Sequence, residues 1–281
     1  MTPNTISITP LNAAFGAHAE GVDLTRSLSI SFARKIEASL LKYKLIIFDK
    51  QLMDEKSIVQ FGRYLGIPFN HPFVENRGIY QPVSTIVNSP GSTPYSADWH
   101  TDVSFVKRPP KLGLLHCEKN PEKGGETQFV DMEDCWNEIP IALRSILLGR
   151  SAFHDFAKER ELTLKVIGQE ALDFNHAKTP GCYHPATRLH PVTNVRSLYI
   201  NQAHTTHIKD LPENESADVL AEVFGIIEKC SSRLELKLAP QHAVLWDQRN
   251  TVHRGLPNYG KNERLLRRLG MGLDSPYETL C

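Results

Sequence analysis

The sequence lacks most features that mark a secreted, membrane-embedded or disulfide-bonded chain. Its five cysteines lie far apart and none forms a Cys-x-x-Cys pair, so neither a disulfide framework nor a zinc ribbon is expected. They are Cys117, Cys135, Cys182, Cys230 and Cys281. The first residues show no basic and apolar leader, and no apolar run approaches the roughly 20 residues that span a bilayer. We therefore expect a cytoplasmic protein with reduced thiols and no signal peptide.

An excess of charge of either sign is also missing. Lysine and arginine together number 32, as do aspartate and glutamate, so the formal net charge is zero. Without a basic surplus we expect no nucleic-acid partner and no anionic membrane partner. The balance gives little repulsion between copies and is compatible with a homo-oligomer, although an average cytoplasmic surface has the same composition.

The 281 residues are enough for one large domain or two ordinary ones. Helical spacing of apolar residues predicts helices over 31–44, 54–65 (with Asp54 as cap), 134–148 and 216–230. Short apolar runs predict strands within 5–23, at 45–48 and 86–87, and over 233–247 and 264–273. Proline and glycine punctuate the later strands as in jelly rolls, which favours an α+β domain around an antiparallel core. The polar stretch 155–185 has no firm period, and we interpret it as a loop that covers a site.

The first pattern that points to chemistry is Trp99-His100-Thr101-Asp102. Residues two apart on a strand point to the same face, so His100 and Asp102 can converge on one point. An imidazole and a carboxylate, joined by a second histidine, make the facial triad that binds iron(II) in oxygenases. One His-x-Asp is weak evidence, because twelve histidines and many aspartates also place such pairs on ordinary surface strands.

His253 is the candidate for the third ligand. The apolar strand 242–247 ends in a polar turn, and His253 then opens the next strand. Such strand ends lie at the mouth of a barrel, where binding sites form. By itself His253 would equally be a turn histidine whose ring bonds to a backbone carbonyl.

Arg264 and Arg268 follow His253 by 11 and 15 residues. A spacing of four puts both on one face of a strand, whereas Arg267 should point to the other face. The planar fork of arginine pairs bidentately with carboxylates and sulfonates, and an iron site that uses 2-oxoglutarate needs such a grip on the distal carboxylate. The alternative is a solvated basic strand formed by all three arginines.

Together these patterns resemble the taurine dioxygenase (TauD/TfdA) family of Fe(II)- and 2-oxoglutarate-dependent dioxygenases over nearly the whole chain. The matching motifs are Gly16-Ala17 with Asp23-Leu24, Trp99-His100-Thr101-Asp102-Val103-Ser104-Phe105, Gly124-Gly125-Glu126-Thr127, His190-Pro191-Val192 with Asn201-Gln202 and Thr205-Thr206, and Trp246-Asp247 with His253, Arg264 and Arg268. The resemblance implies one domain over 1–281, mainly β with flanking helices, folded as a double-stranded β-helix or jelly roll.

The resemblance also implies roles. The Fe(2+) ligands would be His100, Asp102 and His253. Arg264, helped by the Thr127 hydroxyl, would hold the distal carboxylate of the co-substrate 2-oxoglutarate, and Arg268 would face the substrate. With O2, the family releases CO2 and succinate and hydroxylates its substrate. Cleavage follows when the hydroxylated carbon bears a sulfonate or an ether oxygen.

Candidate substrate contacts are His71, Val74, Ser96, Glu159, Arg160 and Arg268. His71-Pro72 matches a His-Pro segment that contacts the substrate in taurine-cleaving relatives. Val74 and Ser96 stand where those relatives have Tyr and Asn, and Glu159-Arg160 where they have Ser-Phe. Because the lining differs, we do not expect taurine in particular, whereas Arg268 still favours a small-molecule substrate that is anionic, such as a sulfonate, carboxylate or amino acid. Glu159 and Arg160 would equally well face solvent on a lid.

Three other functions stay open. A jelly roll that only binds or stores metal would not consume 2-oxoglutarate. A zinc hydrolase could use the same three ligands, although it has no need of a dicarboxylate grip at Thr127, Arg264 and Arg268. A desaturase or epimerase of the same family would share the first steps of the reaction and differ in how its substrate lies.

Overall fold

The computed structural model describes residues 6–72, 82–88, 97–156, 169–170, 173, 177, 179–260 and 262–276. Four of the candidate substrate contacts lie outside these residues: Val74, Ser96, Glu159 and Arg160. Most of the stretch 155–185, which we interpreted as a loop over a site, lies outside them as well.

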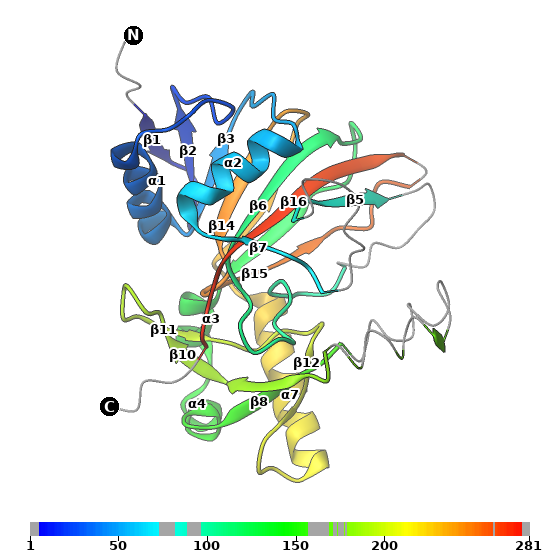
Figure 1. The fold of residues 1–281 in the computed structure, drawn as a ribbon. Helices are drawn as coiled ribbons and strands as arrows, with labels where there is room; N and C mark the ends of the chain where they lie inside the picture. Colours follow the sequence, from blue (N-terminus) through cyan, green and yellow to red (C-terminus); the bar gives the residue numbers. More distant parts are fainter. Residues whose placement is uncertain are drawn as a thin grey trace.

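The largest sheet has eight strands (Figure 1). Their order is β1 (Ser7–Pro10), β2 (Ala17–Glu20), β3 (Leu45–Phe48), β14 (Ala243–Asp247), β6 (Pro110–Lys119), β16 (Arg264–Leu273) and β4 (Pro68–Phe69), and β5 (Ser84–Asn88) also pairs with β16. All of these pairings are antiparallel except that of β2 with β3. The predicted antiparallel core is thereby confirmed.

A smaller sheet faces the inner side of the large one. It consists of β13 (Arg233–Leu236), β7 (Thr127–Asp131) and β15 (Thr251–Gly255). Phe129 and Leu234 of this sheet share a buried cluster with Trp246 and Leu266 of the large sheet, and the rings of Phe129 and Trp246 lie 5.6 Å apart. The two layers form the sandwich of a jelly roll, and among the described residues no pairing closes it into a barrel.

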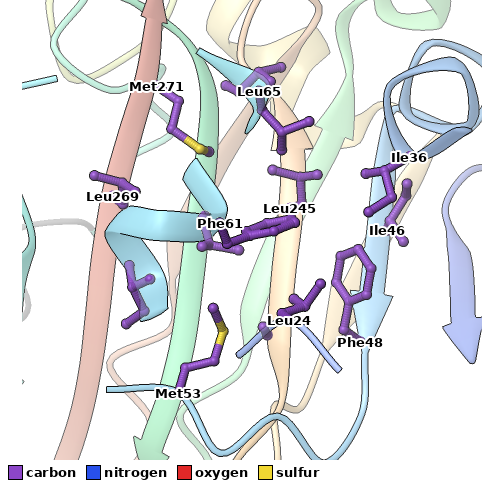
Figure 2. Close-up of a cluster of buried hydrophobic side chains, with 14 of the residues drawn as sticks. Leu24, Ile36, Ile46, Phe48, Met53, Phe61, Leu65, Leu245, Leu269 and Met271 are labelled. Carbon is purple, nitrogen blue, oxygen red and sulfur yellow. The ribbon is translucent and has the colours of Figure 1, made fainter. Parts of the chain in front are cut away.

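Two helices cover the outer face of the large sheet, α1 (Ile30–Tyr43) and α2 (Glu55–Leu65). Figure 2 shows the buried side chains between them and the sheet, among them Phe61, Leu245 and Met271. Asp54 caps α2 as predicted and forms a capping box with Ser57. The cap of α1 is Ser29, whose side chain accepts from the backbone N–H of Phe32.

Three further helices cover the outer face of the smaller sheet: α3 (Met132–Glu138), α4 (Ile141–Leu147) and α7 (Glu213–Lys229). The prediction of a single helix over 134–148 is wrong. Pro140 has no N–H and disfavours a helical conformation at the residue before it, so the chain breaks between α3 and α4. No helix in the described part of the chain is long and apolar enough to cross a membrane.

The prediction of one strand over 233–247 is also wrong. β13 and β14 belong to different sheets. Between them Pro240 has no N–H for a strand ladder, and Gln241 has a left-handed backbone with φ 69. The remaining strands form two small sheets beside α3 and α7, namely β12 (Thr205–Ile208) with β8 (Ser151–His154) and β9 (Cys182–Pro185), and β10 (Thr187–Leu189) with β11 (Arg196–Leu198).

The four described cysteines are buried and free: Cys117, Cys135, Cys182 and Cys230. Burial raises the pKa of the Cys117 thiol to about 11 and that of Cys182 to about 12. These two thiols therefore stay protonated at neutral pH. The described cysteines form no disulfide with one another.

Candidate metal centre

The two candidate histidine ligands lie on adjacent chain segments that pair with each other. His253 is the third residue of β15, which begins at Thr251, so His253 does not open that strand as predicted. His100 forms an isolated antiparallel bridge with it. Each backbone N–H donates to the other residue's carbonyl at 2.9 Å, and the two rings lie 4.2 Å apart. Backbone pairing therefore fixes the separation of the two imidazoles.

Asp102 reaches the same point from a turn. The prediction that it shares a strand with His100 is wrong, because a turn follows the bridge and Val103 adopts a left-handed φ of 56. The buried Ser104 holds this turn, since its Oγ accepts from the Asn201 amide at 2.9 Å and also bonds to His154 and His204 at 3.0 Å. A strained backbone held by tertiary contacts, and not the strand pleat, points the carboxylate at the histidines.

The three side chains form a compact donor set. Their ligand atoms lie within 4.8 Å of one another, and no other such trio is present in the described ranges. The Asp102 Oδ1 atom is 3.9 Å from Nε2 of both His100 and His253. His100 Nδ1 lies 2.8 Å from the Asp98 carbonyl, so it is Nδ1 that carries the proton and Nε2 that is left with a lone pair. Asp102 Oδ2 is buried without a hydrogen-bond partner among the described residues, which fits a divalent cation as the missing partner.

The protonation states of His253 and Asp102 suit a metal. Burial, helped by the nearby His100, lowers the pKa of His253 to about 3, so its ring is neutral near pH 7. Burial raises the pKa of Asp102, but the Arg268 guanidinium and the two histidines outweigh it and hold that pKa well below its usual value. A neutral imidazole beside an ionised carboxylate is the combination in which these groups bind metal ions.

A first hollow runs from the two histidines to Arg264. It is lined by residues of both sheets, namely Ile86, His100, Leu115, Thr127, Trp246, His253, Gly255, Arg264, Leu266 and Arg268. Arg264 is 3% exposed, and its Nη2 donates to the Thr127 hydroxyl at 2.9 Å. Within the described part of the chain it has no ion pair, and its Nε has no hydrogen-bond partner. Burying a cation without a counter-ion costs free energy, so an anion bound at this end of the hollow would be stabilised.

A second hollow borders Asp102. Its walls are Phe69, His71, Pro82, Ser84, Asp102, Val103, Pro110, Arg268 and Gly270. Arg268 borders both hollows, and its Nη1 donates to Asp102 Oδ1 at 2.7 Å. Arg267 points away from both and bonds to Glu118 and Glu55, as the spacing of the three arginines predicts. The structure thus brings His71 and Arg268 together beside the candidate ligands.

Sequence reasoning missed three supporting residues. The Gln248 side chain accepts from the backbone N–H of Asp102 at 2.8 Å. Phe129 stacks on His253, with ring centroids 5.6 Å apart and planes at 21°. Ser104 anchors the turn described above. Gln248 and Ser104 stand within the segments singled out in the sequence, but a motif does not say which atoms its side chains meet.

A jelly roll with two histidines and one carboxylate at its mouth has the donor set of the non-haem iron(II) oxygenases. A family model described as "Taurine catabolism dioxygenase TauD, TfdA family" matches residues 7–269, and the chain belongs to this family. It is therefore an enzyme of the Fe(II)- and 2-oxoglutarate-dependent dioxygenase class.

Relatives of known function cover most of the chain. It is 27% identical over 278 residues to an alpha-ketoglutarate-dependent sulfate ester dioxygenase of Pseudomonas putida, and the aligned region covers 96% of this chain and 91% of the relative. It is 27% identical to an alpha-ketoglutarate-dependent 2,4-dichlorophenoxyacetate dioxygenase of Cupriavidus pinatubonensis, over 88% of this chain and 90% of the relative. The crystal structure of a taurine dioxygenase from Burkholderia xenovorans superposes with a TM-score of 0.78 at 26% identity, covering 99% and 94% of the two chains. These likenesses confirm the predicted jelly roll.

Proposed function

We propose that the chain oxidises a small organic anion at an iron(II) ion held by His100, Asp102 and His253. The observation that carries the proposal is the position of Arg264. It is a buried guanidinium without an ion pair among the described residues, at the far end of the hollow that begins at the two histidines. A dicarboxylate such as 2-oxoglutarate supplies the missing anion with one end and leaves the other end beside the metal.

Each side chain has a distinct task in this proposal. When bound, iron(II) together with 2-oxoglutarate and O2 supplies the oxidising chemistry that converts a substrate C–H bond into C–OH. Arg264 and Thr127 bind and orient the distal carboxylate. Phe129 and Trp246 pack against His253 and keep water away from the ligand ring.

The second hollow supports an anionic substrate that also has an apolar part. His71 and the cationic Arg268 are suited to a sulfate, sulfonate or carboxylate group. Phe69, Val103 and Pro110 form an apolar wall beside them. The only carboxylate among the described lining residues is Asp102, which the metal would occupy, so these residues offer no acid for a substrate ammonium. We therefore favour a sulfate ester, an alkyl or aryl sulfonate, or an aryloxy acid over an amino acid, and a sulfate ester is the substrate of one relative.

An anaerobic titration tests this proposal. Iron(II) and 2-oxoglutarate added to the metal-free chain should give a metal-to-ligand charge-transfer absorption band, and the band should shift with an alkyl sulfate or a phenoxy acid but not with taurine. Zinc in place of iron should give no band, and His100→Ala should give none with iron. An unchanged band in His100→Ala would refute the ligand assignment.

The product of aerobic turnover separates hydroxylation from its alternatives. A substrate product that gains one oxygen atom, or that is cleaved at the hydroxylated carbon, supports the proposal. Loss of two hydrogen atoms indicates desaturation, and an unchanged mass with inverted configuration indicates epimerisation. A band without succinate formation would contradict a catalytic role and favour a metal-binding module.

A further inference from the structure

The residues next to the two candidate histidine ligands meet on the opposite face of the smaller sheet. Trp99 precedes His100, and Arg254 follows His253. Successive side chains of a strand point to opposite faces, so Arg254 faces away from the metal centre while His253 faces it. The Arg254 guanidinium lies over the Trp99 ring, 4.3 Å from its centroid. Trp99 is 1% exposed and belongs to the buried cluster between the sheet and α7.

One carboxylate on α7 binds both of these neighbours. Glu228 Oε2 accepts from the Trp99 indole N–H at 2.7 Å and from Arg254 Nη1 at 2.8 Å. Its Oε1 accepts from Arg254 Nη2 at 3.0 Å, which makes the arginine pair bidentate. Arg233 lies over the Trp99 ring as well, at 5.4 Å, and 4.0 Å from Glu228 Oε1. Glu228 therefore connects the segment before one metal histidine with the segment after the other.

We propose that Glu228 is a positioning residue, which fixes the separation of His100 and His253 by holding Trp99 and Arg254 together. This inference rests on the proposed role of the two histidines as ligands. Between them the two segments make one bridge of two backbone hydrogen bonds and a long bond of 3.3 Å from Thr101 Oγ1 to the Thr251 carbonyl, and the chain after His100 is a turn. A short bridge of this kind needs support from outside the sheet, and the contacts of Glu228 provide it.

A half-exposed ion pair usually contributes little, and the Glu228 side chain is 48% exposed. Three features set this one apart. The pair is bidentate, the same carboxylate accepts from a buried indole, and the guanidinium also packs on that indole. Glu228 is not a member of the buried apolar cluster under α7, so its loss should act locally on the metal ligands more than on the fold.

The test uses the full-length metal-free chain with Glu228→Ala, Glu228→Gln and the control Glu222→Gln. Glu222 is exposed on the same helix and has no hydrogen bond or ion pair among the described residues, so its replacement removes the same charge. Two quantities are measured, the hydrogen exchange of the His100 and His253 amides and the affinity for Mn(II). Glu228→Ala should speed the exchange of these two amides and weaken Mn(II) binding about tenfold, in the range for residues that orient metal ligands. Glu228→Gln keeps an acceptor for Trp99 and should have a smaller effect, and Glu222→Gln should have none.

Two results would overturn the positioning role. One is a Glu228→Ala chain that matches Glu222→Gln in both measurements. The other is faster exchange throughout the chain, which would assign Glu228 to general stability. Failure of the underlying ligand assignment is recognised separately, because His100→Ala would then leave Mn(II) affinity unchanged, whereas the amide exchange of the metal-free chain still reports on the contacts of Glu228.

Discussion

Arg264 and Arg268 stand four residues apart on one face of β16, and their surroundings differ sharply. Arg264 is 3% exposed, bonds to a neutral hydroxyl and has no ion pair in the described part of the chain. The Arg268 side chain is 20% exposed and is already paired with Asp102. One strand thus carries a cation with no counter-ion among the described residues and a cation that holds a candidate metal ligand in its charged form. The comparison shows that residue type and spacing place two arginines on one face of a strand. Whether each arginine still needs an anion depends on the side chain it already contacts, which is a neutral hydroxyl for Arg264 and a carboxylate for Arg268.

The largest expected effect belongs to Arg264. Arg264→Met should raise the concentration of 2-oxoglutarate needed for half-maximal succinate formation at least about 30-fold, because removing one partner of a buried charge pair costs roughly 2–5 kcal/mol. The same change should raise the melting temperature of the ligand-free chain, since it removes a buried charge that has no counter-ion among the described residues.

The matched control is Arg267→Met on the opposite face of the same strand, where the arginine bonds to Glu118 and Glu55. It should leave the 2-oxoglutarate requirement unchanged. Equal losses in the two variants would show that the strand, and not the Arg264 guanidinium, carries the effect.

Arg268→Met should behave in the opposite way. Half-saturation by the organic substrate should rise about tenfold, as expected for the loss of a partly exposed charged contact, while the 2-oxoglutarate requirement stays near that of the unchanged chain. Metal-free Arg268→Met should melt at a lower temperature, because Asp102 is left buried without its cation, and added Mn(II) should restore most of the loss. If Arg264→Met and Arg268→Met shifted the melting temperature of the metal-free chain in the same direction, the two arginines would not differ in whether they have a counter-ion.

A smaller effect concerns His253, which lines the hollow that ends at Arg264. Its pKa is about 3 in the folded chain and near 6.5 when unfolded, so between these values the unfolded state binds the extra proton. Folding stability of the metal-free chain should therefore fall as pH decreases from about 6.5 toward 4. His253→Gln should reduce that slope by up to about 1.4 kcal/mol per pH unit in urea unfolding. Burial also lowers the pKa of His154 and His184, so part of the slope remains. If His253→Gln left the pH dependence of the unfolding free energy unchanged, the pKa of His253 would not be lowered by burial in the folded chain.

The sequence could predict the elements whose cause is local. The strand Leu45–Phe48 and the helix after Asp54 follow from an apolar run and a cap, and the opposite faces of Arg267 and Arg268 follow from the strand period. The break at Pro140 is also visible in the sequence, but the apolar spacing continues on both sides of it and by itself predicts one helix.

What could not be predicted depends on residues far apart in the chain. The turn at Asp102 persists because His154, Asn201 and His204 hold Ser104, and each of these is at least 50 residues away. Likewise the grouping of Trp99 with Glu228 and Arg254 requires that α7 pack on the outer face of β15. The residue pattern thus predicts which side chains are candidate ligands, while tertiary contacts determine how these side chains are oriented toward one another.

The buried cysteines bear on how such a chain withstands its own chemistry. A centre that activates O2 can release oxidants when turnover is not coupled to a substrate, and the thiolate is the form of cysteine that they attack. Cys117 lies on β6 within the electrostatic reach of Arg264, yet with a pKa of about 11 only about one such thiol in ten thousand is ionised at pH 7. Cys182, with a pKa of about 12, is ionised still less often. Burial that serves packing therefore also keeps these two thiols protonated, which makes them poor targets for such oxidants.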